Sequence, residues 1–386
     1  MALRVMSDPA MVGRVHPSPT SPFQIEPLAP FRLDLTAWAL RRRPHNAIDR
    51  WGESTYRRAL SIDHDPVALS VTEDGAPEAP WLSARTGGRR IDPPSERLAR
   101  HALNRLLGLD VDLSAFAAMA ASDPLLGPLA ARMRGLKPPR FPTVFEALVN
   151  GVACQQLSLD VGIHLLNRLT AERGRPVSAD PDVMRTFPGP QELASAEPDE
   201  IKRLGFSHAK ARTIVDSARA IAAGDLDLEG LEELEDAGAI ERLTEMRGIG
   251  RWTAEYVLLR GLGRLHVFPG DDVGAQNKLR RLFDIDADLD YGAVKRLMGR
   301  WYPYAGVVYF HLLLDSLRAG GLVEPPEPAG QIGKDAARGG ATQSWTRFLL
   351  HPGTDDSGLE HTSDEGFKRA DSATADGRRL RGRRHQ

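Results

Sequence analysis

Apolar residues at helical spacing run through the chain from about residue 93 to residue 320, and this pattern constrains the fold more than any other feature. Most segments there carry apolar residues at i, i+3, i+4 and i+7, which is the stripe of a helix packed on one side. Short junctions rich in Gly, Pro or Asp separate the segments, and no repeat of fixed length is present. The pattern therefore predicts that the chain stays helical over this stretch.

A different pattern precedes the helical region. Between Phe31 and about Gly88, the segments FRLDLTAW, TYRRALSI, VALSVT and WLSART alternate apolar with polar residues, and DHDP and EDGAPEAP are typical of turns. This alternation predicts a small antiparallel sheet with one buried face, including a helical stretch somewhere between Trp38 and Trp51. The expected fold class is therefore α+β, with a small N-terminal antiparallel β-sheet domain followed by an all-α region.

The two ends of the chain lack both patterns. Residues 1–24 are rich in Pro, Ser and Gly, and residues 323–386 are rich in Gly, Asp and Arg with a basic end. We expect both to be disordered, because they hold too few apolar residues to form a core. The short apolar patch WTRFLL in the tail has no assigned function. The expected domains are then an α+β domain over residues 25–105 and a helical region over residues 106–322.

One stretch, Leu243 to Phe283, carries a chemical signal. A helix is predicted to end at Met246, the Gly248-Ile249-Gly250 turn follows, and a second helix begins at Arg251. Two closely spaced glycines permit positive φ and close backbone approach, and the free amides of the second helix favour an anion such as phosphate. Arg247 beside the turn and Arg251 could add charge-assisted hydrogen bonds. Taken alone, the turn fits a tight corner between two helices equally well.

The surrounding residues make the signal specific. LTEMRGIGRWTAEYVLLRGLG followed by VFPGDD resembles the signature of the helix-hairpin-helix (HhH-GPD) DNA glycosylase superfamily. VNGVACQQLS, FPGPQELASAEPDEIKRLGFSHAKARTIVDSA and RWYPYAGVVYFHLLL stand in the order of its DNA-3-methyladenine glycosylase II (AlkA-type) branch. The resemblance covers roughly residues 25–322 and implies two helical subdomains with the active-site cleft between them.

The resemblance implies that Asp272, after the VFPGD loop at the start of the next helix, is the catalytic carboxylate. An anion beside C1′ stabilises the positive charge that develops on the sugar as the N-glycosidic bond breaks, and can also orient or deprotonate the attacking water. Asp272 would equally suit a helix N-cap, and Asp271 is the rival carboxylate. Bifunctional members carry Lys where this chain has Trp252, so the resemblance implies a monofunctional enzyme without AP-lyase activity.

Three aromatic residues match the positions that line the base pocket of the family. Trp252 and Tyr256 are one helical turn apart and can project from one face. Tyr304 is the third, and it replaces a Trp of the family. An aromatic cleft suits N-alkylated purines because their rings are cationic and stack on aromatic faces. Core packing is the alternative role for these rings.

The Cys154–Ser158 segment matches the family's wedge, with Gln156 at the inserting position and Leu157 beside it. A glycosylase must flip its target base out of the duplex, and a wedge then fills the gap. The alternative for this segment is a polar helix C-terminus that faces solvent.

The cysteine and histidine content limits the cofactors. Cys154 is the only cysteine, which excludes a disulfide framework and the iron–sulfur cluster of another branch of the superfamily. The 11 His lack metal-ligand spacing, so no catalytic metal is predicted. The resemblance points to a structural Na⁺ or K⁺ at the carbonyls of Thr244, Met246 and Ile249.

The formal net charge of −2 argues at first against a DNA-binding protein. However, the stretch from Asp225 to Glu245 holds nine acidic residues and one Arg, whereas the stretch from Arg247 to Arg281 holds seven basic and three acidic residues. We therefore expect phosphate affinity to be confined to one face.

The leading prediction is a monofunctional DNA N-glycosylase of base excision repair. It would act as a monomer on double-stranded DNA, remove alkylated bases of the 3-methyladenine and 7-methylguanine type, and leave an abasic site. The alternatives are a glycosylase of the same fold for oxidised or deaminated bases, and a non-catalytic damaged-DNA-binding protein. Since no apolar run reaches the length of a membrane span or signal peptide, we expect a cytoplasmic, nucleoid-associated protein.

Overall fold

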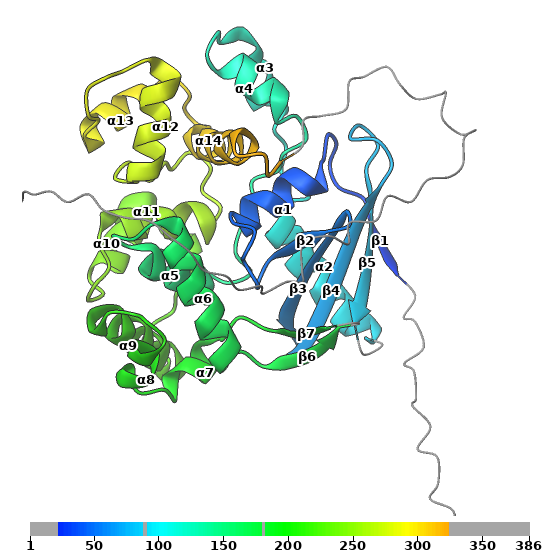
Figure 1. The fold of residues 1–386 in the computed structure, drawn as a ribbon, viewed down its shortest axis with the longest axis vertical. Helices are drawn as coiled ribbons and strands as arrows, with labels where there is room; N and C mark the ends of the chain where they lie inside the picture. Colours follow the sequence, from blue (N-terminus) through cyan, green and yellow to red (C-terminus); the bar gives the residue numbers. More distant parts are fainter. Residues whose placement is uncertain (1–21, 88–90, 180–181, 324–386) are drawn as a thin grey trace, which may run out of the picture. The chain divides into compact units, whose positions relative to one another are not determined.

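The computed structural model describes residues 22–87, 91–179 and 182–323 (Figure 1). The predicted leader up to residue 21, and the predicted tail from residue 324 with its WTRFLL patch, lie outside the described residues. The last residues assigned to the leader belong to the fold, because the first strand begins at Phe23.

The N-terminal part is a five-stranded antiparallel sheet of order β1-β5-β4-β3-β2, as the alternating segments predict. Its strands are β1 Phe23–Ile25, β2 Arg50–Gly52, β3 Thr55–Ile62, β4 Asp65–Asp74 and β5 Trp81–Gly87. One face packs on two helices, α1 (Leu33–Arg41) and α2 (Pro93–Leu107), to form a core of its own. Asp92 caps α2 by accepting from the amide of Ser95 at 2.9 Å.

The prediction that FRLDLTAW pairs in the sheet was wrong, because Leu33–Arg41 forms α1. Six of its nine residues are buried, on more than one side of the helix. A helix that is buried on several sides lacks the single apolar stripe by which a helix is recognised in sequence. In this segment, apolar and polar residues happen to alternate as they do in a strand. Leu and Ala are strong helix formers, and Asp34 in the first turn and Arg41 in the last suit the helix dipole.

The rest of the described chain is mainly helical, with short connections between elements. The elements are α3 Ser114–Ser122, α4 Leu126–Arg132, α5 Val144–Cys154, α6 Leu159–Arg173, α7 Pro190–Ala194, α8 Pro198–Arg203, α9 His208–Ala223, the 3₁₀ helix η1 Glu229–Glu233, α10 Asp236–Thr244, α11 Arg251–Arg260, α12 Val273–Phe283, α13 Tyr291–Gly299 and α14 Ala305–Ala319.

The expectation of unbroken helix after residue 93 was wrong at one place, where β6 (Pro176–Ala179) pairs with β7 (Asp182–Arg185) as a hairpin. Proline at the start of β6 and the β-branched Val177 and Val183 favour extended backbone over helix. Val177 packs against Ala59 and Ala68 of the large sheet, so the hairpin joins the helical region to the N-terminal domain.

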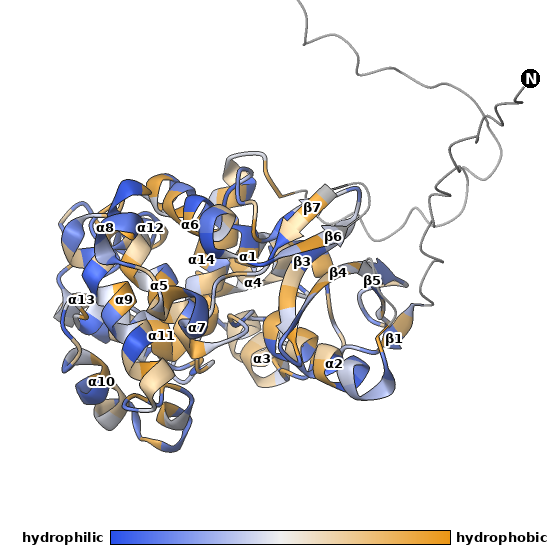
Figure 2. Ribbon diagram, turned by 90° about the horizontal axis from the view of Figure 1, so that it is seen from below, coloured by the Kyte–Doolittle hydropathy of each residue, from blue (hydrophilic) through white to orange (hydrophobic). Residues whose placement is uncertain are grey.

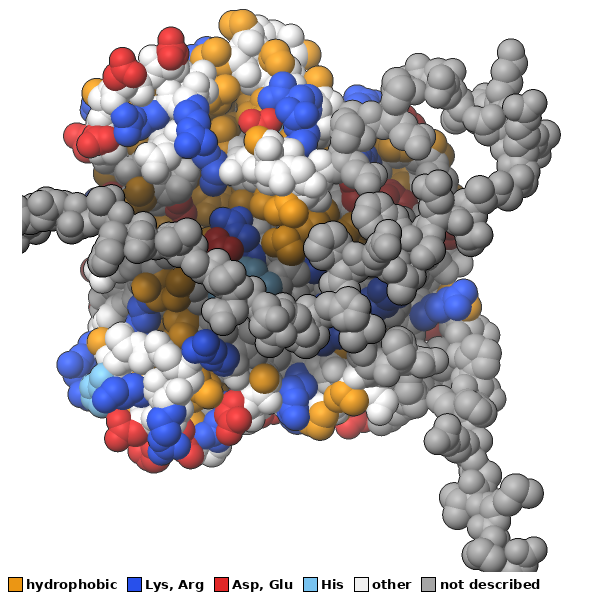
Figure 3. Space-filling view, viewed as in Figure 1, with side chains coloured by type: hydrophobic (Ala, Val, Ile, Leu, Met, Phe, Trp, Pro, Cys, Tyr) orange, Lys and Arg blue, Asp and Glu red, His pale blue; other side chains and the backbone are white. Residues whose placement is uncertain are grey.

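Most helices of this region pack around two large hydrophobic cores, and a smaller core joins α1, α11 and α14. One core is built mainly from α5, α6, α9, α10 and α11, and the other from α3, α4, α12, α13 and α14. Figure 2 shows hydrophobic and hydrophilic residues on the same helix, for example on α9 and α10, as expected for elements with one buried side. Figure 3 shows a recess between the surface over α12 and α14 and the surface over α8 and α9, with basic and acidic side chains inside it.

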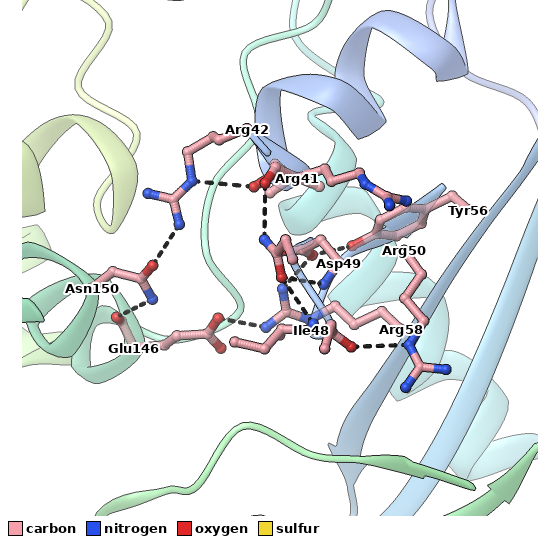
Figure 4. Close-up of polar contacts among 12 residues, drawn as sticks. Arg41, Arg42, Ile48, Asp49, Arg50, Tyr56, Arg58, Glu146 and Asn150 are labelled. Carbon is pink, nitrogen blue, oxygen red and sulfur yellow. Dashed lines mark hydrogen bonds and ion pairs between the residues drawn. The ribbon is translucent and has the colours of Figure 1, made fainter. Parts of the chain in front are cut away.

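A buried polar network ties the N-terminal domain to α5 (Figure 4). Arg58 of β3 pairs with Asp49 and with Glu146 of α5, both at 2.5 Å, and the three side chains are at most 5% exposed. Tyr56 donates to the same Asp49 oxygen at 2.7 Å. The Arg58 guanidinium lowers the pKa of Asp49 against the opposing effect of burial. Because a buried charge is costly without its partner, the network fixes the domain against α5.

Candidate active site

The turn between α10 and α11 rests on α9. Gly248 has φ of +85°, and a Cβ there would lie 2.3 Å from Thr213 Oγ1, so only glycine fits. The Thr213 hydroxyl lies 3.1 Å from the carbonyl oxygen of Arg247, to which it can donate. Gly250 has φ of −103° and an open surrounding, so the left-handed conformation is confined to the first glycine. Ile249, 5% exposed, anchors the turn in the core.

The two arginines at the turn differ in their contacts. Arg247 is exposed, and its side chain forms no hydrogen bond or ion pair with the part of the chain that the structure describes. Arg251, at the start of α11, donates to Asp271 Oδ2 at 2.9 and 3.0 Å and lies over the ring of Tyr291. The rival carboxylate Asp271 is therefore used to hold Arg251.

Asp272 is the N-cap of α12, and its two carboxylate oxygens have separate partners. Oδ1 accepts from the amide of Ala275 at 2.8 Å, which is the capping hydrogen bond. Oδ2 accepts from Trp252 Nε1 at 3.3 Å and from the Tyr309 hydroxyl at 3.0 Å. Asp272 can therefore cap the helix and lie beside Trp252 at the same time, and these hydrogen bonds fix the direction of its carboxylate.

Sequence reasoning missed Tyr309, which lies on α14 five residues after Tyr304. Burial and the neighbouring Asp272 carboxylate raise the pKa of Tyr309 well above its usual value, so the hydroxyl keeps its proton. The segment YPYAGVVYF contains three tyrosines and was already assigned to the site through Tyr304. This cluster of aromatic residues could have pointed to Tyr309.

The rings of Trp252 and Tyr256 stack, with centroids 5.5 Å apart and planes at 26°. Trp252 is partly exposed, whereas Tyr256 is 4% exposed. Arg42, just after α1, donates to the Tyr256 hydroxyl at 3.0 Å and to Asn150 Oδ1 at 2.7 Å. Arg42 is 5% exposed and has φ of +59°, an uncommon conformation for a residue other than glycine. The N-terminal domain therefore reaches the aromatic pair.

Tyr304 does not join this pair among the described contacts. It is the N-cap residue of α14, and its ring packs edge-on against Phe116 at 5.7 Å in the second core. The structure thus brings together Trp252, Tyr256 and Asp272, and Tyr309 also contacts the carboxylate. The role of Tyr304 in the base pocket stays a prediction.

The wedge segment separates α5 from α6. Gln156 is exposed with φ of +53°, and Leu157 is 44% exposed, although it is a large apolar residue. Val161, one turn later on α6, is also 44% exposed. Lys210 of α9 donates to the carbonyls of Ala153 and Gln155 at 3.1 and 2.6 Å, which holds the base of the segment.

A small space beside the carboxylate comes from Gly274. A Cβ at this position would lie 3.2 Å from Asp272 Oδ1 and 3.9 Å from Lys278 Nζ, so both groups border the space that the missing side chain leaves. Burial lowers the pKa of the Lys278 amine. Sequence reasoning missed this lysine, which lies on the same helix as the carboxylate.

Within residues 22–87, 91–179 and 182–323, no cluster of three or more His, Cys, Asp or Glu could hold a metal ion. Among the same residues, no helix is both long and apolar enough to span a membrane. Cys154 is partly buried, and burial raises the pKa of its thiol, so it lacks the character of a nucleophile.

The chain is similar to a known protein family and to several named relatives. Residues 149–304 match the family model described as the HhH-GPD superfamily base excision DNA repair protein. The DNA-3-methyladenine glycosylase of Bacillus subtilis is 31% identical over 204 residues, which are 53% of this chain and 67% of the relative. DNA-3-methyladenine glycosylase 2 of Escherichia coli is 26% identical over 71% of this chain and 90% of its own length.

Coverage differs among the relatives. A second Bacillus subtilis protein, YfjP, is 31% identical, but the match spans 44% of this chain and only 58% of the relative. Among solved structures, the 3-methyladenine DNA-glycosylase of Archaeoglobus fulgidus has a TM-score of 0.69 and 26% identity. That match covers 78% of this chain and 100% of the archaeal one, so it includes both the sheet and the helical region.

Proposed function

The chain belongs to the HhH-GPD superfamily of base excision DNA repair proteins, and on that premise we propose that it is a monofunctional DNA N-glycosylase that removes alkylated bases. The observation that carries the proposal is the Asp272 carboxylate, fixed at the start of α12 beside the stacked rings of Trp252 and Tyr256. The names of the relatives support alkylated purines, of the 3-methyladenine and 7-methylguanine type, as the substrate class.

Double-stranded DNA is the proposed partner. The turn at Gly248 and the free amides at the start of α11 suit a backbone phosphate, and Arg247 adds a positive charge without a protein partner among the described residues. Gln156 and Leu157 are exposed and suited to fill the gap that a flipped nucleotide leaves. The proposal includes a monomeric enzyme that works on nucleoid DNA in the cytoplasm.

The aromatic pair explains a preference for alkylated bases. An N-alkylated purine carries a positive charge on its ring, and such a ring stacks favourably on Trp252. The same charge makes the base a good leaving group, because it departs as a neutral molecule without needing a proton. The site therefore requires no general acid next to the base.

The bond-breaking step places the developing charge next to Asp272. As the N-glycosidic bond breaks, its electron pair leaves with the base and positive charge builds on C1′. The Asp272 carboxylate stabilises that charge, and a water molecule then attacks C1′ and loses a proton. Trp252 stands where bifunctional relatives carry a nucleophilic lysine, so the product is an intact abasic site.

No resident cofactor is part of the catalytic step. The proposal retains a monovalent cation, Na⁺ or K⁺, at the carbonyl oxygens of Thr244, Met246 and Ile249. Thr244 ends α10, and Met246 and Ile249 lie on the connection to α11, where the Met246 carbonyl also accepts from the Ile249 amide at 3.1 Å. The cation would stiffen the turn that binds phosphate. To test this part, the affinity for duplex DNA is measured in a K⁺ buffer and in a buffer whose only cation is too bulky to enter the turn. The affinity should be higher in K⁺.

The decisive experiment is incubation of the full chain with alkylated duplex DNA, with the released bases identified by mass spectrometry. Asp272→Asn keeps the shape and cap of the residue but removes its charge, so excision should fall at least about 100-fold while DNA binding persists. Asp290→Asn is the matched control, because Asp290 caps α13 by accepting from Ala293 at 2.6 Å.

Three outcomes would contradict the proposal. Undiminished turnover in Asp272→Asn would remove Asp272 from the mechanism. Release of oxidised or deaminated bases alone would indicate a glycosylase for other lesions. Tight binding of damaged DNA without release from any lesion would indicate a non-catalytic DNA-binding protein.

A further inference from the structure

We propose that Tyr309 is a positioning residue that aims the Asp272 carboxylate. The inference rests on the proposed function, which makes Asp272 the catalytic carboxylate. Its basis is a side-chain contact between two elements far apart in sequence, since the Tyr309 hydroxyl of α14 donates to Asp272 Oδ2 at 3.0 Å.

The fold brings α14 to the loop before Asp272 through Gly306. A Cβ at Gly306 would lie 2.6 Å from Leu259 Cδ1, 2.7 Å from the Val267 carbonyl oxygen and 2.8 Å from the Leu265 carbonyl oxygen. The Gly306 amide donates to that Leu265 oxygen at 2.7 Å. This close approach puts Tyr309, less than one turn further along α14, beside the loop.

Tyr309 contacts the loop in two ways. Its ring packs edge-on against Phe268 with centroids 5.6 Å apart, and its hydroxyl reaches the carboxylate four residues later. Among the described residues, that hydroxyl forms no other hydrogen bond. The ring fixes the position of the hydroxyl, so the donor remains aimed at Oδ2 before any substrate arrives.

This arrangement fixes the orientation of Asp272. Three donors surround the carboxylate, namely the Ala275 amide on Oδ1 and Tyr309 with Trp252 on Oδ2. The backbone amide holds one oxygen, and the two side-chain donors hold the other from two different helices. Without the Tyr309 hydroxyl, the direction of Oδ2 would depend on the longer bond to Trp252 at 3.3 Å.

A spectroscopic test asks whether the contact exists in solution, without relying on activity. The chain has six tyrosines, so the protein labelled with 3-fluorotyrosine gives six ¹⁹F signals, and Tyr309→Phe identifies one of them. Removing the neighbouring negative charge with Asp272→Asn should lower the pH at which the Tyr309 signal titrates. The signal of Tyr302, which is 69% exposed and has no described contact with Asp272, is the internal reference.

A kinetic test then measures the role. Tyr309→Phe removes one oxygen and keeps the ring, so single-turnover excision from alkylated duplex should fall about tenfold with unchanged affinity for DNA. The unchanged affinity separates this role from a general structural defect, which would weaken DNA binding as well. Tyr302→Phe makes the same chemical change at an exposed site and should leave the rate unchanged.

The two proposals fail in different ways. An unchanged excision rate in Tyr309→Phe, or a Tyr309 signal that titrates alike in both backgrounds, would overturn the role of Tyr309. If the wild-type chain releases no base from any alkylated duplex, the proposed function fails, while the ¹⁹F experiment still decides whether the hydroxyl and the carboxylate interact.

Discussion

The side-chain amide of Gln155 donates to the carbonyl oxygen of Gly248 at 2.9 Å, which joins two segments 93 residues apart. The same nitrogen also donates to Thr253 Oγ1 in the first turn of α11, at 2.8 Å. The exposed wedge residues follow directly after Gln155, and the proposed phosphate-binding turn contains Gly248. The two segments therefore form one rigid unit, so that contact with the DNA backbone and insertion into the base stack are geometrically coupled.

Replacing Gln155 should separate binding from base flipping. Gln155→Met keeps the length of the side chain but loses both hydrogen bonds, each worth about 1 kcal/mol, so excision from a paired site should fall about 30-fold. The loss should be smaller when the damaged base lies in a mismatch, because such a base costs less to unstack. Single-turnover rates on the two duplexes give the comparison. Gln191→Met, at an exposed position on α7, is the control, and equal losses on both duplexes would contradict the coupling.

The absence of a lysine at position 252 predicts the behaviour of the abasic product. Borohydride reduction traps an imine between a lysine and the C1′ aldehyde, so wild-type protein with abasic DNA should give no covalent complex. Trp252→Lys should produce one, because it places an amine beside Asp272. The measurement is a denaturing gel with labelled DNA. If the wild type does form a covalent complex and Lys278→Arg does not, the Lys278 amine reaches the sugar.

The buried Arg58 network should contribute strongly to stability. Arg58→Met leaves two facing carboxylates, Asp49 and Glu146, without their cation, and such a change typically costs about 3–5 kcal/mol. Urea denaturation followed by circular dichroism measures the loss. Arg57→Met is the control, because Arg57 is the next residue on β3, and its pair with Glu53 at 3.8 Å is exposed. Equal stabilities of the two variants would refute this account.

Glu73 should make stability depend on pH. Burial raises its pKa to about 7, although the Leu33 amide donates to Oε2 at 2.8 Å, and its other oxygen is buried without a partner. A raised pKa in the folded state means that the stabilising contribution is complete below pH of about 4.5 and is lost as pH rises through about 7. Glu73→Gln should therefore be more stable than wild type at pH 8, by about 1 kcal/mol, and equal to it near pH 4.

Melting temperatures of both proteins across that pH range measure the effect. The exposed Glu233→Gln serves as the control. A difference between Glu73→Gln and wild type that stays constant with pH would mean that Glu73 does not titrate in this range.

The sequence predicted the parts of the fold that depend on local pattern. The strands TYRRALSI, VALSVT and WLSART form β3 to β5, as their alternation predicts. Burial alternates along β5, whereas β3 is buried on both faces, because Ala59 and Ala68 pack against the β6–β7 hairpin. The expectation of a single buried face was therefore wrong for this part of the sheet. Asp272 caps α12, as its place before a helical stripe predicts. The segment Leu33–Arg41 was misread because it is buried on several sides, which erases the helical stripe.

The parts that depend on tertiary contact were not predictable in this way. Tyr309 and Tyr304 lie on the same short stretch of sequence, and only the packing of α14 through Gly306 decides which of them reaches Asp272. Arg42 is one of three consecutive arginines, and no feature of the neighbouring sequence identifies it as the one that donates to Tyr256. The two residues are 214 positions apart in the chain. The roles of the site residues stay predictions until the variants above are measured.

The contact between Arg42 and Tyr256 also limits how the sheet domain and the helical region of related proteins can be combined in chimaeras. A chimaera that takes its helical region from one parent and its sheet domain from another would receive the two sides of this hydrogen bond from different sources. The Asn150 amide, which accepts from the same guanidinium, would be mismatched as well. Crossovers between relatives should therefore keep residues 31–49 with the helical parent, and grafts that ignore this linkage should yield folded proteins with altered choice of base.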